Sequence, residues 1–171
     1  ITSRQFQSLT EPHLAALEVT VDSDNWSGAL VVESAVNAAV ANRNVTADHA
    51  LDHHHLVPVA TTQIASDTVL AEVSTSQSLV RIATAVRTRV RATEAVSHRR
   101  PVLDSAYAGH ILTVHLAPGT PVTVEKIAAV ATSRDAAIST AALAAEDRIA
   151  RAPLFADLLD AHTLAWQQLW D

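Results

Sequence analysis

A regular alternation of side chains between Leu79 and Ala92 constrains the fold of this chain most. Its arginines occupy odd-numbered positions, at Arg81, Arg87, Arg89 and Arg91. Its apolar and β-branched side chains lie between them, at Val80, Ile82, Thr84, Val86, Thr88 and Val90. Successive residues of a β-strand point to opposite faces. The pattern therefore predicts a long strand with one apolar face and one solvated face.

Further segments of the first two-thirds of the chain have strand patterns and are separated by polar turns. The turn "SDNWSG" ends at Gly28, and the turn "PGTP" contains Gly119. Strands at this spacing, without long helices between them, predict antiparallel sheets packed as a sandwich. The predicted strands are residues 4–9, 13–22, 29–36, 68–75, 79–92, 110–117 and 122–132.

After Thr132 the periodicity becomes helical. Ser133 is a suitable N-cap for a helix that begins near Arg134 or Asp135, and Pro153 ends this helix. Its apolar stripe is Ile138, Ala142, Ala145 and Ile149, and the stripe of a second helix is Phe155, Leu158, Leu159, His162, Trp166, Leu169 and Trp170. Two tryptophans one turn apart need a surface to pack on, which either the sheet or a further domain supplies.

Composition excludes several classes of protein. The 171 residues suffice for one domain with a core, and 49% of them are apolar, so the chain is not disordered. No apolar run approaches the ~20 residues that a bilayer requires. The net charge of −6 argues against nucleic-acid binding. Cysteine is absent, which excludes disulfides and thiol nucleophiles. Since the chain starts on Ile1, we expect a fragment of something longer.

Three consecutive histidines, His53, His54 and His55, raise the question of a metal site. Zinc ligands need a rigid frame on which two imidazole rings converge. Adjacent strand residues point to opposite faces, so only His53 and His55 could share a metal, with His49 as a third ligand. We expect a surface turn of unusual composition that binds metal weakly, and we assign no metal-binding residue.

Carboxylates, aromatic residues and the other histidines give no convincing catalytic pattern. Glycosidase chemistry needs two carboxyl groups facing one sugar. The acidic candidates have no recognisable pairing, and we expect solvated surface groups. Trp26 either stacks on a sugar or closes a turn, and the turn is favoured. For His162 we expect packing, and for His98 beside Arg99 and Arg100 an exposed loop, with an anion site as the alternative. The remaining candidates are Glu11, Glu18, Asp22 and Asp24, and also Asp104 and Tyr107, which we expect in the loop "RRPVLDSAYAG".

Four phrases of the sequence resemble, in this order, the N-terminal region of glycoside hydrolase family 65. They are "SLTEPHLAALEVTVDSDNWSG", "TSQSLVRIATAVRTRV", "PVTVEKIAAVATSRDAAIS" and "DLLDAHTLAWQQLW". The family contains phosphorylases and hydrolases of α-glucosides such as trehalose, maltose, kojibiose and nigerose. The resemblance implies a mainly-β fold: part of an antiparallel β-sandwich (supersandwich, galactose-mutarotase-like) followed by two C-terminal α-helices.

The resemblance also implies a domain organisation. Residues 1–132 correspond to the latter part of the N-terminal sandwich, and residues 133–171 to linker helices leading to a catalytic (α/α)6 barrel absent from this chain. The catalytic glutamate and the phosphate-binding residues of the family lie in that barrel. We therefore assign no catalytic or cofactor-binding residue here, expect no cofactor, and expect the chain to be inactive alone. Inorganic phosphate is a co-substrate of the family's phosphorylases.

The resemblance favours a supporting role in a cytoplasmic α-glucoside phosphorylase or hydrolase. Its expected partners are the chain's own barrel domain, an α-linked disaccharide bound by that barrel, and a second copy in a homodimer; nucleic acid and membranes are not expected. Two alternatives stay open. One is a free-standing carbohydrate-binding sandwich with Trp26 and Tyr107 as contacts, and the other is a histidine-based metal module.

Overall fold

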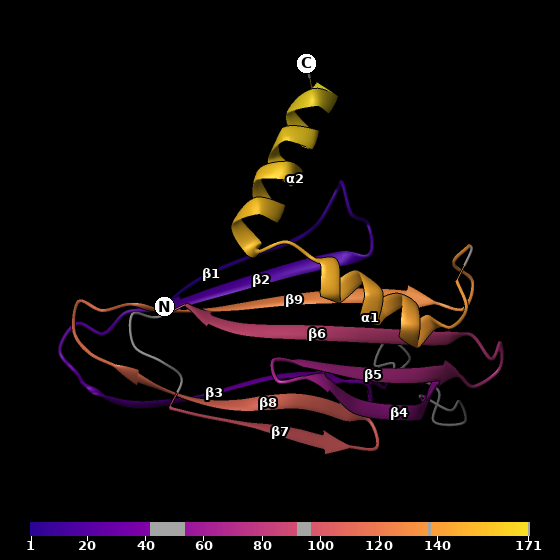
Figure 1. Cartoon of the computed structure of the whole chain (residues 1–171), viewed down its shortest axis with the longest axis horizontal. Coiled ribbons are helices and arrows are strands. Elements are labelled where there is room, and N and C mark those ends of the chain that lie inside the picture. Colours follow the sequence, from indigo (N-terminus) through magenta and orange to yellow (C-terminus); the bar gives the residue numbers. More distant parts are fainter. Residues whose placement is uncertain (42–53, 92–96, 137, 171) are drawn as a thin grey trace, which may run out of the picture.

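The computed structural model describes residues 1–41, 54–91, 97–136 and 138–170. Two antiparallel sheets lie face to face, and two helices lie on the outer side of the larger sheet (Figure 1). The larger sheet has the order β1-β2-β9-β6-β5-β4, and the smaller has the order β3-β8-β7. This confirms the expected fold class, an antiparallel β-sandwich followed by two C-terminal helices. None of the helices in the described residues is long and apolar enough to cross a membrane.

The elements follow one another along the chain without a long interruption by helix. The strands are β1 (Thr2–Gln7), β2 (Leu14–Val21), β3 (Gly28–Asn37), β4 (Leu56–Ala65), β5 (Thr68–Thr75), β6 (Arg81–Arg91), β7 (His98–Asp104), β8 (Tyr107–Leu116) and β9 (Val122–Thr132). The helices are α1 (Ala141–Arg151) and α2 (Phe155–Trp170).

The sequence pattern alone did not single out the strands β4 and β7, although the family resemblance implies that a strand begins at His55 and Leu56, where β4 begins. Both strands lie at a sheet edge, and each contains a proline, Pro58 in β4 and Pro101 in β7. Proline cannot donate a ladder hydrogen bond, so it is confined to edges and bulges, and its presence weakens a strand pattern. The pairing of β4 with β5 is also irregular between Pro58 and Ala60. The segment containing Asp104 and Tyr107, expected to be a loop, is the β7–β8 hairpin.

The arginine-bearing face of β6 is solvated only in part, whereas the sequence pattern predicted a fully solvated face. Arg81, Arg89 and Arg91 are exposed, but the part of the face between Ala83 and Arg87 is covered. Helix α1 packs on β6 and β9, and Ala83 and Ala85 are 0% exposed beneath it. Arg87, on the same face, is only 5% exposed. Alanines at alternate positions leave room for a helix to approach the sheet. The alternation therefore identified the strand correctly, but not what covers its polar side.

Helix α1 begins later than the Ser133 cap predicts. Its N-cap is Thr140, whose Oγ1 accepts a hydrogen bond from the Leu143 N–H at 3.2 Å. Ser133 instead accepts a bond from the Arg81 N–H through its Oγ at 3.1 Å, which ties the end of β9 to β6. Asp135 accepts from the Thr132 hydroxyl at 2.8 Å. The two polar residues thus belong to a turn after β9, and Arg148 and Arg151 occupy the last turn of α1 as expected.

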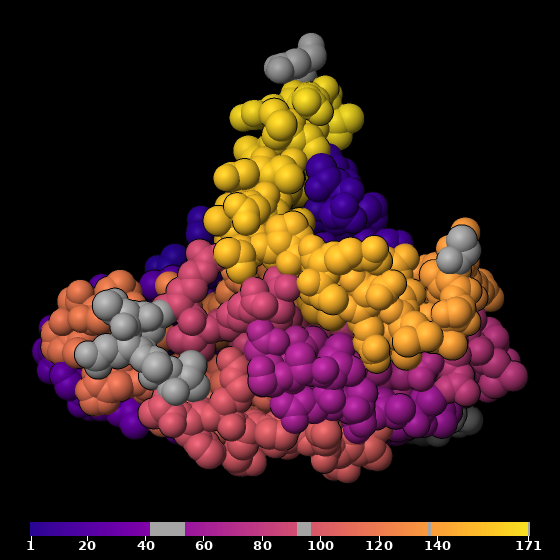
Figure 2. Space-filling view, viewed as in Figure 1, coloured from indigo at the N-terminus to yellow at the C-terminus, as the bar shows by residue number. Residues whose placement is uncertain are grey.

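Helix α2 stands away from the sandwich and touches it mainly at its base. Phe155 and Leu158 are 0% and 1% exposed and join the core cluster between the sheet and the helices. The rest of the helix projects outward, as the space-filling view shows (Figure 2). An apolar helix that buries only its first turn leaves most of its apolar stripe uncovered.

Candidate functional site

The most unusual surface of the molecule is the outward half of α2, which we call the aromatic surface (Trp166, Leu169 and Trp170). The exposed fractions of these side chains are 41%, 65% and 81%. The two indoles stack, with ring centroids 6.4 Å apart and an interplanar angle of 16°. Large apolar side chains gathered on one face of a soluble domain mark an interaction site.

His162 lies between this surface and the body of the domain. Its ring is 4.8 Å from that of Phe6 between centroids, and its Nδ1 is 3.1 Å from the Leu9 amide nitrogen. Its Nε2 is 3.1 Å from the Trp166 indole nitrogen. A neutral imidazole has one acceptor nitrogen. Only one of these two donors can therefore be satisfied in a given tautomer. His162 thus packs α2 against the β1–β2 turn, as a packing histidine should.

The side chain of Arg87 extends from β6 to the connection between α1 and α2. Its guanidinium donates to the carbonyl oxygens of Ile149 (3.1 Å), Ala152 (2.9 Å) and Pro153 (2.7 Å). These carbonyls end α1 and lead into α2. A cation at a helix C-terminus interacts favourably with the helix dipole. Burial and the nearby Arg89 charge lower the pKa of Arg87 and the Glu125 carboxylate opposes them, but an arginine stays protonated.

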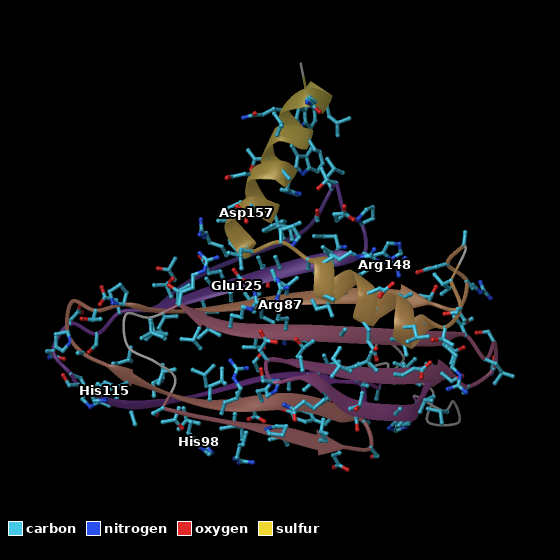
Figure 3. All side chains as sticks on the ribbon, in the orientation of Figure 1. Arg87, His98, His115, Glu125, Arg148 and Asp157 are labelled. Atoms are coloured by element: carbon cyan, nitrogen blue, oxygen red, sulfur yellow. The ribbon has the colours of Figure 1, made fainter. Side chains whose placement is uncertain are left out.

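Glu125, which has the opposite charge, extends from β9 to the first residue of α2. It is 1% exposed, and its Oε2 accepts from the Phe155 N–H at 2.7 Å. The same oxygen accepts from Arg91 Nη2 at 2.5 Å. Figure 3 shows Arg87 and Glu125 directly beneath the place where α1 passes into α2. Hydrogen bonds to charged groups contribute about 1.5–3 kcal/mol each. We call Arg87 and Glu125 the junction pair; sequence patterns did not single it out.

A second buried polar group lies between the sheets. Ser34 and Thr88 join β3 to β6 through their hydroxyl oxygens at 2.8 Å. Arg99 donates to the Thr88 carbonyl at 3.0 Å. His110 is 1% exposed, and neither ring nitrogen has a hydrogen-bond partner among the described residues. Nearby, burial lowers the pKa of Lys126, whose Nζ donates to the Ala35 carbonyl at 2.7 Å.

His110 should make the domain sensitive to acid. Burial and the Arg99 charge lower its pKa, with Asp67 opposing them. The unfolded chain therefore takes up a proton at this histidine near pH 6.5, before the folded chain does, and folding free energy is lost as the pH falls below that value. In urea unfolding at pH values above and below 6.5, His110→Gln should reduce this loss. The exposed His115→Gln is the control. An equal loss in wild type and His110→Gln would contradict the assignment.

The structure separates the carboxylates considered as glycosidase candidates. Glu18 lies on β2, is 7% exposed and pairs with Arg4 at 2.5 Å, so it is not the solvated group that we expected. Glu11 lies in the β1–β2 turn, whereas Asp22 and Asp24 follow β2. These placements bring no two of them together as a catalytic pair. Asp104 ends β7, and its Oδ1 accepts from the Ser105 N–H at 2.7 Å.

Trp26 closes the turn before β3, and its side chain remains partly exposed. Its main chain bonds the Ser23 hydroxyl through both N–H (3.0 Å) and carbonyl (2.5 Å). Its indole lies on Gly28, where an added Cβ would stand 2.4 Å from Cζ2. The side chain is 49% exposed. Tyr107 donates to Glu33 at 2.5 Å and pairs with Asn37, at the other end of β3.

The histidine candidates fall in different places. His49 and His53 lie outside the described residues, so the proposed metal cluster is not described. His54 and His55 are exposed, and the His55 carbonyl accepts from the Ser76 N–H at 2.9 Å. Among the described residues no group of histidine, aspartate or glutamate side chains is arranged to hold a metal ion.

The anion site considered at His98, Arg99 and Arg100 is divided by the pleat of a strand. All three residues belong to β7 and do not form a loop. His98 and Arg100 are exposed, whereas Arg99 reaches inward to Thr88. Successive residues of a strand face opposite sides, so the three charges do not converge.

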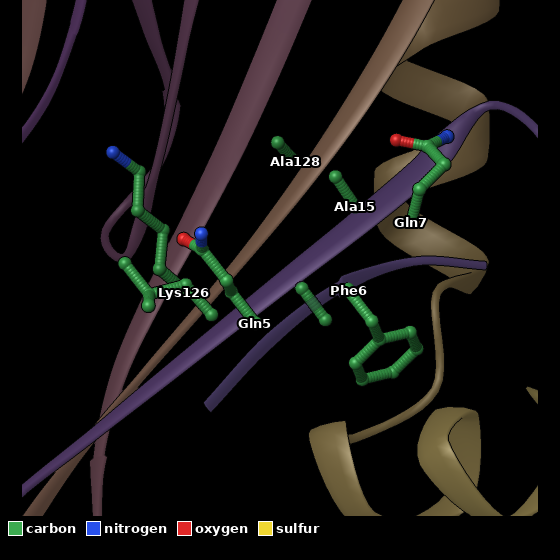
Figure 4. A pocket seen from close by; sticks show the side chains of 8 residues that line it. Gln5, Phe6, Gln7, Ala15, Lys126 and Ala128 are labelled. Carbon is green, nitrogen blue, oxygen red and sulfur yellow. The ribbon is translucent and has the colours of Figure 1, made fainter. Parts of the chain in front are cut away.

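A hollow of about 470 Å³ lies along β1, β2 and β9 (Figure 4). The polar side chains in it are Gln5, Gln7 and Lys126, over a floor that includes Ala15 and Ala128. None of its lining residues is acidic. The hollow therefore lacks the carboxyl pair that hydrolysis of a glycoside requires.

Comparisons with known proteins agree with this architecture. The family model described as "Glycosyl hydrolase family 65, N-terminal domain" matches residues 1–169. Two curated relatives, uncharacterised glycosyl hydrolases of Mycobacterium tuberculosis strains CDC 1551 and H37Rv, are each 37% identical over 173 residues. These alignments cover 100% of this chain but 13% of each relative.

A solved structure of a proposed kojibiose phosphorylase from the human microbiome has the same fold. Its TM-score is 0.75 at 12% identity, over 95% of this chain and 20% of that one. The architecture is that of a β-sandwich domain with a helical extension. The chain belongs to glycoside hydrolase family 65, and it matches the N-terminal domain of that family.

Proposed function

We propose that this chain is a non-catalytic part of an α-glucoside phosphorylase or hydrolase. Residues 1–132 form the latter part of an N-terminal sandwich, and residues 133–171 are linker helices that join it to a catalytic (α/α)6 barrel. The observation that carries this proposal is the aromatic surface of α2, where Trp170 is 81% exposed at the far end of the helix. The hollow and the candidate carboxylates offer no catalytic pair in its place.

The length of the relatives supports the same proposal. The chain spans 13% of each curated relative and 20% of the solved chain that it resembles. The substrate of the complete enzyme is an α-linked disaccharide of the trehalose or maltose type, with inorganic phosphate as co-substrate if it is a phosphorylase. The enzyme is cytoplasmic, and a second copy is a further partner. These features rest on membership of the family alone.

The aromatic surface can be tested in the complete polypeptide. The double variant Trp166→Ser/Trp170→Ser should lower the thermal midpoint and reduce turnover of α-glucosides several-fold, because large aromatic side chains carry much of the energy of an interface. Gln167→Ser, an exposed change on the same helix, is the matched control. If stability and turnover match those of the control, α2 does not contact the barrel.

Residues 1–171 alone should not cleave trehalose, maltose or kojibiose, with or without phosphate. Glu18 and Glu125 lie opposite each other on β2 and β9, but both are buried and held in ion pairs with Arg4 and Arg91, so they do not face a sugar as an acid and a base. Product release is measured by chromatography over a long incubation. Turnover that persists in material purified to constant specific activity would contradict the proposal.

A carbohydrate-binding role is the second candidate, because Ser23 holds the main chain of Trp26 and the Trp26 side chain is half exposed. Trp26 and Tyr107 cannot form one platform. They lie at opposite ends of β3, whose ten residues span about 30 Å. Calorimetry with millimolar trehalose, maltose and kojibiose tests Trp26 by itself. Heat of binding that Trp26→Ala abolishes would support this candidate, and no heat would reject it.

A further inference from the structure

We propose that the junction pair, Arg87 and Glu125, sets the direction in which α2 leaves the sheet and so positions whatever follows Trp170. The inference deepens the scaffold role proposed above. It states that two buried side chains of the sandwich determine the orientation of the helical extension. Neither residue touches a reacting group, so both are positioning residues.

The first argument is the placement of the two charges. Arg87 on β6 binds three carbonyl oxygens at the end of α1 and in the connection. Glu125 on β9 binds the N–H of Phe155, the first residue of α2. Each charge has the sign that the helix end beside it favours. Both strands belong to one sheet and are directly paired, so the two attachment points have a fixed separation.

The second argument is that few other contacts orient the first turn of α2. The connection between the helices is short, from Ala152 to Leu154. Only Phe155 and Leu158 of α2 are buried, and apolar packing alone does not specify a direction as hydrogen bonds do. Further along, His162 meets Leu9 and Phe6, which supports one side of the helix. The junction pair is therefore the directional element at the point where the chain turns.

The third argument is the burial of the pair. Arg87 and Glu125 are 5% and 1% exposed; the salt bridge of Glu125 is with Arg91 at 2.5 Å, and Arg87 is bound by backbone carbonyls. Buried charges of this kind add little stability compared with apolar side chains of similar size. Charged residues kept at such positions have an attested use in specifying one arrangement among several. One arrangement of α2 is what a domain that carries another domain requires.

The test measures the direction of α2 in the complete polypeptide. Spin labels are attached at Gln77→Cys, in the β5–β6 turn, and at Gln167→Cys, on α2. This chain contains no cysteine of its own, and any cysteine outside it is replaced first. Wild type should give one narrow distance. Glu125→Leu removes the acceptor for the Phe155 N–H and should give a broadened or shifted distribution of label distances, and Arg87→Met should do the same. Glu125→Gln retains an acceptor oxygen and should give the same narrow distance as the wild type.

The controls separate direction from folding. Arg89→Gln changes the neighbouring arginine on the same face of β6, which pairs with Asp67 at 2.9 Å and with neither helix. It should keep the narrow distance. Circular dichroism shows which variants remain folded, and if Glu125→Leu unfolds, Arg87→Met decides. An unchanged distance in every folded variant that lacks a junction contact overturns the proposal. Both spin labels lie within this chain, so the measured distance tests the junction pair even if the domain that follows is not catalytic.

Discussion

Phe155→Ala is expected to lower the free energy of unfolding by about 3–5 kcal/mol, the range for removing a buried aromatic ring. Phe155 is 0% exposed and lies where the sheet and both helices meet. Its ring contacts that of Phe6 edge-on at 5.4 Å between centroids, and the Arg4 guanidinium lies 5.1 Å from its centre. The cavity would open beneath the first turn of α2. Chemical denaturation measures the loss.

The control for Phe155→Ala is Leu164→Ala on the same helix. Leu164 is 55% exposed, so truncating it leaves no cavity and should change stability by less than about 1 kcal/mol. If the two variants lose equal stability, the base of α2 is not packed as described.

Gly109→Ala should destabilise the smaller sheet by about 1–3 kcal/mol, as overpacking of a well-packed site does. A Cβ at this position would lie 2.5 Å from the Ala35 Cβ and 2.8 Å from the Ser34 carbonyl oxygen. Ser34 and Ala35 belong to β3, which is paired with β8 along its whole length, so these atoms cannot move aside without shifting a strand. Thermal unfolding followed by circular dichroism measures the change.

Gly28→Ala is the informative comparison for this variant. The three atoms nearest to its Cβ would all belong to the indole of Trp26, a half-exposed side chain that can swing into solvent. We therefore expect a smaller loss than for Gly109→Ala, although its nearest contact is the shorter of the two. The reverse order would mean that the Trp26 turn is the more rigid of the two sites.

The fold could be predicted where the sequence pattern is local. The alternation in β6 and β9 predicted both strands, and the stripe from Phe155 to Trp170 predicted α2. The sequence pattern did not single out the edge strands β4 and β7, because Pro58 and Pro101 interrupt it. The start of α1 was misplaced because Ser133 and Thr140 are both chemically suitable caps. Which of the two caps the helix depends on the bond from Arg81 to Ser133, a contact between distant parts of the chain.

The junction pair could not be predicted because its meaning depends on tertiary packing. Arg87 looked like one more solvated arginine on a strand that carries several. The alanines beside it, Ala83 and Ala85, were the available signal, since small side chains permit a helix to lie against the sheet. Glu125 similarly lies in a mostly apolar strand, where the only other charged residue is its neighbour Lys126. Charges in a strand of this kind indicate buried partners, but not which helix end supplies them.

The free edge of β3 affects how the chain behaves apart from its parent protein. Among the described strands β3 is paired on one side only, with β8. The edge strands β4 and β7 each contain a proline, whereas the ten residues of β3 include neither proline nor lysine. An unprotected strand edge of this length is a template for pairing with another chain. Separated from its natural neighbours, the chain is therefore prone to intermolecular sheet growth at β3, independently of the tryptophans of α2.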